Sequence, residues 1–160
     1  MGTFSKAIPS MGGYIAGSRS LCDFLYHQAR GFIYSGALMP SATAAASAAL
    51  CVIEEEPERV RTLHDNQRYF AGQLKSLGFS FLNSETAIFP IICGDDWNAW
   101  RLARHCQRRG VYVQAIPHPV VPKGTARLRA AVSAAHSRED LDFCIAALRD
   151  GTLDDNSILR

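Results

Sequence analysis

The stretch Gly-Thr-Phe-Ser-Lys-Ala-Ile-Pro-Ser-Met-Gly-Gly-Tyr-Ile-Ala-Gly, residues 2–17, decides how this 160-residue chain is interpreted. Its lysine, Lys6, follows Thr3 and Ser5 and precedes the pair Gly12-Gly13. A lysine that forms a Schiff base must be partly dehydrated, and small or apolar neighbours suit that requirement. Hydroxyl groups can donate to a phosphate, and glycines let the backbone approach a bulky ligand. On these residues alone, a surface lysine in a glycine-containing turn is still the favoured interpretation.

The composition is that of an ordinary globular protein, with 48% hydrophobic and 20% charged residues. The 17 basic and 15 acidic residues give a formal net charge of +2. One dense basic group, Arg101, Arg104, Arg108 and Arg109, is interpreted as the solvated face of a helix, because no aromatic platform or basic stripe accompanies it in the sequence pattern. We therefore expect no nucleic-acid partner.

The five cysteines lie far apart and form no CxxC pair, which favours reduced thiols that serve as small apolar residues. This pattern predicts a cytoplasmic protein with no metal site. The longest weakly polar stretch, residues 37–53, contains Pro40 and several hydroxyl residues, so it does not resemble a bilayer span. The first residues show no targeting pattern and read like an internal segment. We expect no membrane association.

A composition shift near Gly78 predicts two parts, residues 1–78 and 79–150, followed by a flexible tail at 151–160. The first part is rich in glycine and alanine, and the second alternates short strands with helices. The elements expected in the first part are a short strand at 14–16, a helix from Ser18 or Ser20 to Gly31, a strand at 32–34, a buried helix at 42–56 and a helix from Pro57 to Gly78.

The second part reads as a small α/β unit. A capping box at Ser137 and Asp140 should open its last helix. Strands are expected at 87–93 and 111–116, and between them a helix that is capped by Asp96, carries Trp100, Ala103 and Cys106 and ends at Gly110. A further strand is expected at 127–132. Its alternation places Leu128, Ala130 and Val132 on one face and Arg127, Arg129 and Ala131 on the other.

Five segments resemble the α-oxoamine synthases, a family that includes aminooxononanoate synthase, 2-amino-3-ketobutyrate CoA ligase, 5-aminolevulinate synthase and serine palmitoyltransferase. They are residues 2–17, 29–38, 94–96, 121–129 and 133–137, and they cover nearly the whole chain in order. Separate matches at family-like spacing are hard to obtain by chance. With this resemblance, a functional role for Lys6 is favoured over a surface lysine in a turn.

The resemblance implies the cofactor pyridoxal 5'-phosphate (PLP), bound as a covalent aldimine to Lys6. It also implies that Thr3 hydrogen-bonds the cofactor phosphate and that Ser35 reaches the phosphate in a neighbouring subunit's site. Many relatives carry a hydroxyl where this chain has Gly36. Freed by the incoming amino acid, Lys6 would remove the α-proton, and the carbanion would attack an acyl-CoA or acyl-carrier thioester. Loss of carboxylate would then yield an aminoketone.

Arg129 matches the family's arginine that holds the amino-acid carboxylate, and guanidinium geometry suits such a bidentate contact. Arg127 fits the family motif less specifically, so we interpret it as a solvated or structural charge. We interpret His136, just before the last helix, as a hydrogen-bonded structural group and not as a catalyst. Neither His64 nor His118 has a convincing partner for nucleophilic chemistry.

The implied fold class is α/β, namely the C-terminal part of a PLP-dependent transferase of fold type I: the end of the large domain plus the small C-terminal α/β domain. The family's phosphate loop, ring-stacking aromatic residue and pyridine-binding aspartate precede the lysine and do not occur here. We therefore expect a C-terminal segment that acts as a homodimer or with a complementing N-terminal fragment. Two alternatives stay open: a noncatalytic remnant that serves as an oligomerisation or binding module, and a PLP-dependent aminotransferase.

Overall fold

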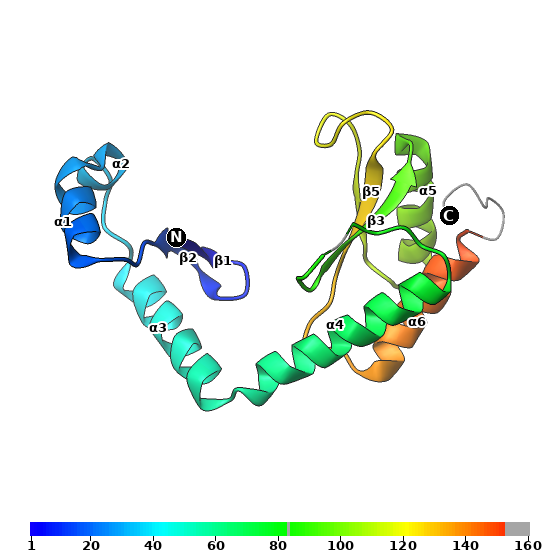
Figure 1. Cartoon of the computed structure of the whole chain (residues 1–160), viewed down its shortest axis with the longest axis horizontal. Helices are drawn as coiled ribbons and strands as arrows, with labels where there is room; N and C mark the ends of the chain where they lie inside the picture. The colour runs from blue at the N-terminus through cyan, green and yellow to red at the C-terminus, as the bar shows by residue number, and fades with distance from the viewer. Residues whose placement is uncertain (83, 153–160) are drawn as a thin grey trace. The chain divides into compact units, whose positions relative to one another are not determined.

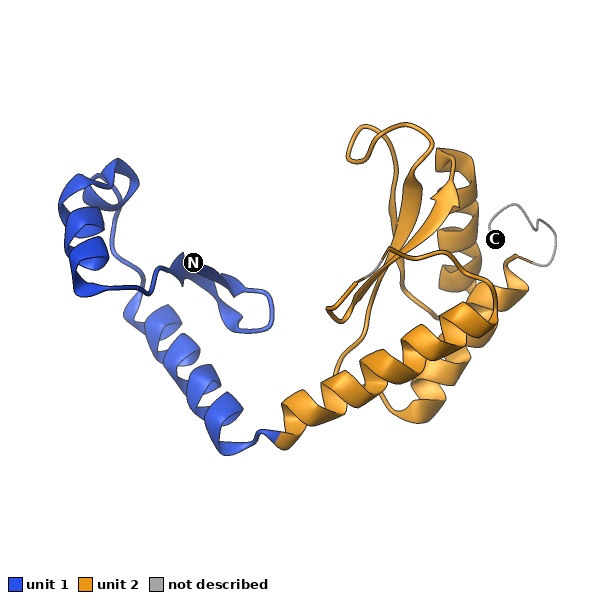
Figure 2. Cartoon of the chain, in the orientation of Figure 1, with its two compact units in different colours: residues 1–57 blue, residues 58–160 orange. Residues whose placement is uncertain are grey.

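The computed structural model describes residues 1–82 and 84–152 and forms two compact units, Met1–Pro57 and Glu58–Arg160 (Figure 2). The boundary between the two units follows Pro57, earlier in the chain than the boundary that we predicted near Gly78. Helix α4 (Glu58–Ser76) accounts for the difference, because it buries Phe70 and Leu74 in the core of the second unit. Of the predicted tail, residues 153–160 lie outside the described residues.

Unit 1 begins with an antiparallel hairpin of strands β1 (Gly2–Ser5) and β2 (Pro9–Tyr14). In its register Thr3 lies opposite Gly13. The two glycines are required there, because Gly12 has a φ of 85° and a Cβ on Gly13 would lie 2.6 Å from the carbonyl oxygen of Gly2. The strand that we predicted at 14–16 therefore lies earlier in the chain.

The helices of unit 1 are α1 (Arg19–Gln28), α2 (Arg30–Ile33) and α3 (Pro40–Glu55). Ser18 caps α1 by accepting the backbone N–H of Leu21. The strand predicted at 32–34 was wrong, because this short apolar run finds no described strand to pair with and forms helical hydrogen bonds such as Tyr34 N–H to Arg30 O. Helix α3 was expected to be buried, but Ala46 is its one buried residue among those described.

Unit 2 contains a three-stranded antiparallel sheet in the order β3-β5-β4 (Figure 1). Its elements after α4 are β3 (Ile88–Gly94), α5 (Asp96–Arg108), β4 (Gln114–Ile116), β5 (Ala126–Ala131) and α6 (Arg138–Asp150). Helix α5 packs on the sheet and on α6, and α6 also packs on α4. The predicted capping box is confirmed at Ser137 and Asp140. The cap of α5 is Asp95, one residue before the predicted Asp96.

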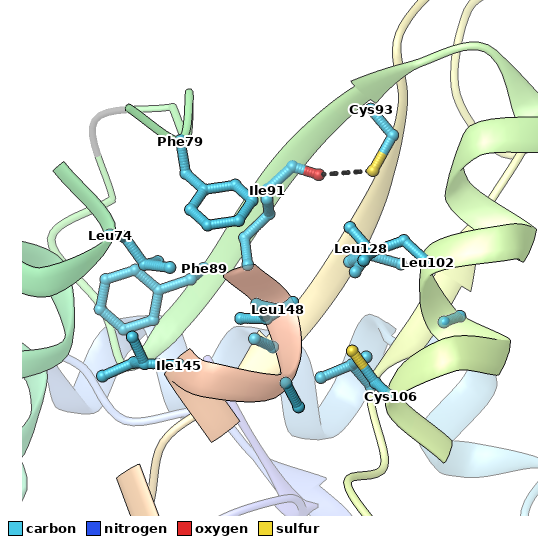
Figure 3. Packing of buried hydrophobic residues seen from close by; sticks show 14 of the residues in the cluster. Leu74, Phe79, Phe89, Ile91, Cys93, Leu102, Cys106, Leu128, Ile145 and Leu148 are labelled. Carbon is cyan, nitrogen blue, oxygen red and sulfur yellow. Dashed lines mark hydrogen bonds between the residues drawn. The ribbon is translucent and has the colours of Figure 1, made fainter. Parts of the chain in front are cut away.

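The core of unit 2 lies between the sheet and its helices (Figure 3). The alternation predicted for β5 is confirmed, since Leu128 and Ala130 are buried while Arg129 is exposed. Leu102 of α5 packs toward Leu128 (Figure 3). Trp100, by contrast, is 56% exposed on α5. Among the described residues, no helix is both long enough and apolar enough to cross a membrane.

Candidate functional site

Lys6 lies where β1 turns back toward β2, and its side chain belongs to a short chain of hydrogen bonds. Lys6 Nζ donates to Ser5 Oγ at 3.2 Å, and the hydroxyls of Ser5 and Thr3 are 3.0 Å apart. Thr3 Oγ1 also donates to the carbonyl oxygen of Gly12 at 3.3 Å. Because residues two apart in a strand share a face, the hairpin brings one amine and two hydroxyls together.

This group is open to solvent within unit 1. Lys6, Ser5 and Thr3 are all exposed, while Ile8 in the turn is buried and anchors it. We expected small and apolar residues to dehydrate Lys6. Within unit 1 they do not do so: α3 packs on β2, where Ser10 Oγ donates to the carbonyl oxygen of Ala42, but Lys6 itself stays exposed. Dehydration of this amine therefore requires additional protein.

A cavity of unit 1 lies at the opposite end of the hairpin from Lys6. Its volume is about 510 Å³ and its lining is mostly apolar, with Gly13 and Tyr14 of β2, Leu25 of α1 and Phe32 of α2. None of Thr3, Ser5 and Lys6 contributes to this lining. The cavity therefore lies apart from the three polar residues of the hairpin.

Ser35 lies just after α2, and its hydroxyl donates to the carbonyl oxygen of Gly31. The bond helps to end the short helix, because it satisfies one of its last carbonyl groups. A serine hydroxyl that donates one hydrogen bond still has two acceptor lone pairs, but its single proton is committed. A phosphate contact from Ser35 would require this bond to open.

Arg129 lies at the centre of β5, between Pro90 of β3 and Gln114 of β4. Its side chain is on the face opposite the core and is exposed. It forms no ion pair with the residues that the structure describes. Arg127, two residues earlier, is half-buried and donates from Nε to the carbonyl oxygen of Thr125 at 3.0 Å. Of the two, Arg129 is the one available to bind a carboxylate.

His136 has a structural role, as its position indicated. Its Nδ1 accepts the backbone N–H of Ser133 at 3.1 Å, and its carbonyl oxygen accepts Nδ2 of Asn66 at 2.9 Å. Asn66 is buried on α4, so these bonds fasten the loop before α6 to that helix. The imidazole orders a turn and lies far along the chain from the lysine segment.

The residues of the hairpin fit PLP. A phosphate-bearing aldehyde needs an amine with which to condense and hydroxyl or amide donors for its phosphate. Lys6, Ser5 and Thr3 supply these groups in one connected cluster. Ser5 was noted as a possible donor but not chosen with Thr3 and Ser35. The alternation of the strand, which places Ser5 on the face of Thr3, is the signal that favours it.

Comparisons with known proteins show the family to which the chain belongs. The family model "Aminotransferase class I and II" matches residues 1–148. The chain is 45% identical over 147 residues to an 8-amino-7-oxononanoate synthase of Symbiobacterium thermophilum, a match that covers 92% of this chain and 38% of that protein. It is 46% identical over 147 residues to the synthase of the same name from Thermoanaerobacter pseudethanolicus, which covers 92% of this chain and 37% of that protein.

A solved structure of a serine palmitoyltransferase with a PLP internal aldimine matches with a TM-score of 0.88 and 25% identity. The match covers 94% of this chain and 38% of that one. The chain thus spans well under half the length of the relatives that it matches, and its predicted α/β, fold-type-I architecture is confirmed. This chain belongs to the aminotransferase class I and II family and, within it, to the α-oxoamine synthases, whose cofactor is pyridoxal phosphate.

Proposed function

We propose that this chain contributes part of a PLP-dependent acyltransferase that condenses an amino acid with an acyl-CoA or acyl-carrier thioester. Loss of carboxylate then gives an aminoketone. The observation that carries the proposal is the connected cluster of Lys6, Ser5 and Thr3 at the end of the hairpin. The identity of 45% to an 8-amino-7-oxononanoate synthase supports the choice of reaction class.

Each residue of the cluster has a defined task in this proposal. When bound, PLP supplies an electron sink for the negative charge that forms at the substrate Cα. Lys6 Nζ anchors the cofactor and, once the amino acid has released it, takes the Cα proton. The hydroxyls of Thr3 and Ser5 would donate to the phosphate, which requires the bond from Thr3 Oγ1 to the carbonyl oxygen of Gly12 to open, and so set the position of the ring relative to that base.

Arg129 is proposed to bind the carboxylate of the amino-acid substrate. Its guanidinium is exposed on the open face of β5 and lies in a central strand, which restricts the backbone on both sides. Two parallel N–H donors match the two oxygens of a carboxylate, and hydrogen bonds to charged groups contribute about 1.5–3 kcal/mol each. Such a contact would orient the Cα–H bond as well as bind the substrate.

The partner in this proposal is more polypeptide of the same kind of protein, either a second copy or a complementing N-terminal segment. Its task is to cover Lys6, which is exposed in unit 1, and so to lower the hydration of the amine. The first relatives are more than twice as long as their matched part, since only 38% of the S. thermophilum protein is matched. We place the protein in the cytoplasm, a proposal supported by its five free cysteines.

A second candidate function is a noncatalytic binding or oligomerisation module. The exposure of Lys6 favours it, because the amine is not removed from water within unit 1, as Schiff-base chemistry requires. Unit 2 also has a continuous core that does not depend on the hairpin residues.

Titration of the purified chain with PLP separates the two candidates. We expect visible absorption that Lys6→Ala abolishes and that the matched variant Lys75→Ala, which removes an amine from α4, leaves intact. Borohydride should fix the cofactor on its amine, and mass spectrometry should find it on the peptide with Lys6. Gly13→Ala should weaken this labelling, because the added Cβ would clash with Gly2 and disturb the hairpin. Equal absorption and labelling of all variants would exclude the acyltransferase proposal for this chain.

A further inference from the structure

Helix α5 has two faces with opposite character. The residues that it buries against the sheet and α6 are Asn98, Ala99, Leu102, Ala103 and Cys106. At roughly 100° per residue, Trp97, Trp100, Arg104 and Arg108 fall within an arc of about 80° on the other side. All four are exposed, and we call them the Trp–Arg stripe. Figure 1 shows α5 against the sheet of unit 2, so the stripe faces away from that sheet.

Two tryptophans lie beside these arginines. We interpreted the basic group as a solvated helix face because no aromatic platform or basic stripe accompanies it in the sequence pattern. Arg104 and Arg108 are exposed, and Trp97 and Trp100 share their face and are 75% and 56% exposed. Tryptophan carries a large apolar surface and is enriched where one protein binds another. Two of them one turn apart form a surface that favours a contact over solvation.

The arginines of the stripe are not neutralised within the described chain. Arg104 and Arg108 form no ion pair with any described residue. The two carboxylates at the start of α5 are already engaged: Asp95 caps the helix, and Asp96 accepts the backbone N–H of His118 at 2.9 Å. The stripe therefore presents an apolar end and a positive end along one line.

The spacing selects the kind of partner. Arg104 and Arg108 are one turn apart, a rise of about 6 Å, which equals the spacing of two acidic residues four apart on a second helix. A membrane surface fits less well, because the apolar face that a helix would insert is already used in the core. Nucleic acid fits less well too. Its binding depends on contacts between many phosphates and basic side chains, and this chain has a net charge of only +2.

We propose that the Trp–Arg stripe docks an acidic amphipathic helix of a partner protein. Its carboxylates lie against Arg104 and Arg108, and its apolar side chains lie against Trp97 and Trp100. Helices packed in this way have axes about 8–10 Å apart, close enough for both kinds of contact. The proposal does not depend on PLP chemistry, because no residue of the stripe belongs to the candidate site.

Fluorescence tests the proposal directly, because Trp97 and Trp100 are the two tryptophans of the sequence. The probe is a synthetic helical peptide of about 20 residues, with two glutamates four residues apart and leucines one and two turns further along. We expect its addition to shift the emission to shorter wavelengths in a saturable way. The affinity should fall as salt is raised, because exposed charges are screened.

Charge reversal gives the matched comparison. Arg104→Glu with Arg108→Glu should weaken binding by at least about tenfold, since like charges then face each other. Arg61→Glu with Lys75→Glu changes the net charge by the same amount on α4 and should leave the affinity within about twofold of the parent. A peptide with lysines in place of the glutamates should bind the first variant better than the parent.

Several results would overturn the proposal. One is an unchanged emission spectrum with the glutamate peptide, and another is an equal loss of affinity in both charge-reversed variants. An equal shift with anionic phospholipid vesicles or with a single-stranded oligonucleotide would assign the stripe to those surfaces. A shift that depends on protein concentration alone would show that a second copy of the chain covers it.

Discussion

The two units of this chain use apolar residues in opposite ways. In unit 2, phenylalanine, leucine and isoleucine side chains from the sheet and three helices form one continuous buried cluster. In unit 1, Ile8 and Ala46 are the buried hydrophobic residues among those described, whereas Phe24 is 62% and Tyr34 is 81% exposed. An apolar face is buried only when a second layer covers it. Unit 2 supplies that layer itself, and unit 1 does not.

The difference teaches where stability and chemistry lie in this protein. Burial of apolar surface is the main favourable term in folding, so the free energy of unfolding of the chain must come largely from unit 2. The candidate cofactor residues all lie in unit 1, where the hairpin is fixed by local hydrogen bonds and glycine packing. Three experiments test this division, and a fourth examines the start of α6 within unit 2.

The largest effect is expected from truncating the core of unit 2. Phe89→Ala removes a ring that is fully buried against Phe70, with centroids 5.1 Å apart. It should lower the free energy of unfolding by about 3–5 kcal/mol. The matched variant Phe24→Ala, on exposed α1, should change it by less than about 0.5 kcal/mol. Urea unfolding followed by circular dichroism measures both, and similar losses would refute the division.

Thiol reactivity should divide the cysteines by unit. Burial raises the pKa of Cys93 and Cys144 to about 11 and that of Cys106 to about 12, which suppresses their reactive thiolates. Cys22 and Cys51, in unit 1, are exposed. At about pH 8, two thiols should react with a disulfide reagent at least about 100-fold faster than the other three. Equal reaction rates of all five thiols in the native protein would contradict this prediction. In the control, the protein unfolded in urea, all five thiols should react at the same rate.

Helix caps provide a smaller comparison. Ser137 caps α6 in unit 2, and Ser18 caps α1 in unit 1. Ser137→Ala should lower the free energy of unfolding of unit 2 by about 1 kcal/mol. Ser18→Ala should leave the unfolding midpoint unchanged and reduce only the helical signal of α1, because α1 has no buried residue in the described chain. A common shift of the midpoint would mean that the units unfold together.

The smallest expected effect is on the stability of the protein at acid pH. The backbone N–H and the hydroxyl of Ser137 donate to Asp140 and lower the pKa of its carboxyl. A lowered pKa in the folded state means that the stabilisation is complete above the ordinary carboxyl pKa of about 4 and is lost as the pH falls through the folded value. Asp140→Asn should therefore flatten the loss of stability below about pH 4. Glu139→Gln, one residue earlier and exposed, should keep the parent's profile.

Much of unit 2 could be predicted from the sequence, because its signals are local. The capping box at Ser137 and the alternation around Arg129 depend on neighbours a few residues away. The strand expected at 32–34 failed for the complementary reason, since a short apolar run becomes a strand only if another strand lies beside it. Trp100 was counted with the apolar residues of α5, although its angle about the helix places it on the other face.

The sequence by itself determined the family and the order of the elements in unit 2, and it led to the prediction that Lys6 is the reactive lysine, because these depend on short motifs and on the periodicity of the backbone. Only the tertiary structure decided that Ser5 links Lys6 to Thr3, that α4 belongs to unit 2, and that Arg104 and Arg108 form no ion pair within the described part of the chain. The physical reason is that hydrogen bonds and burial depend on distances in space, which residues far apart in the chain acquire only when it folds.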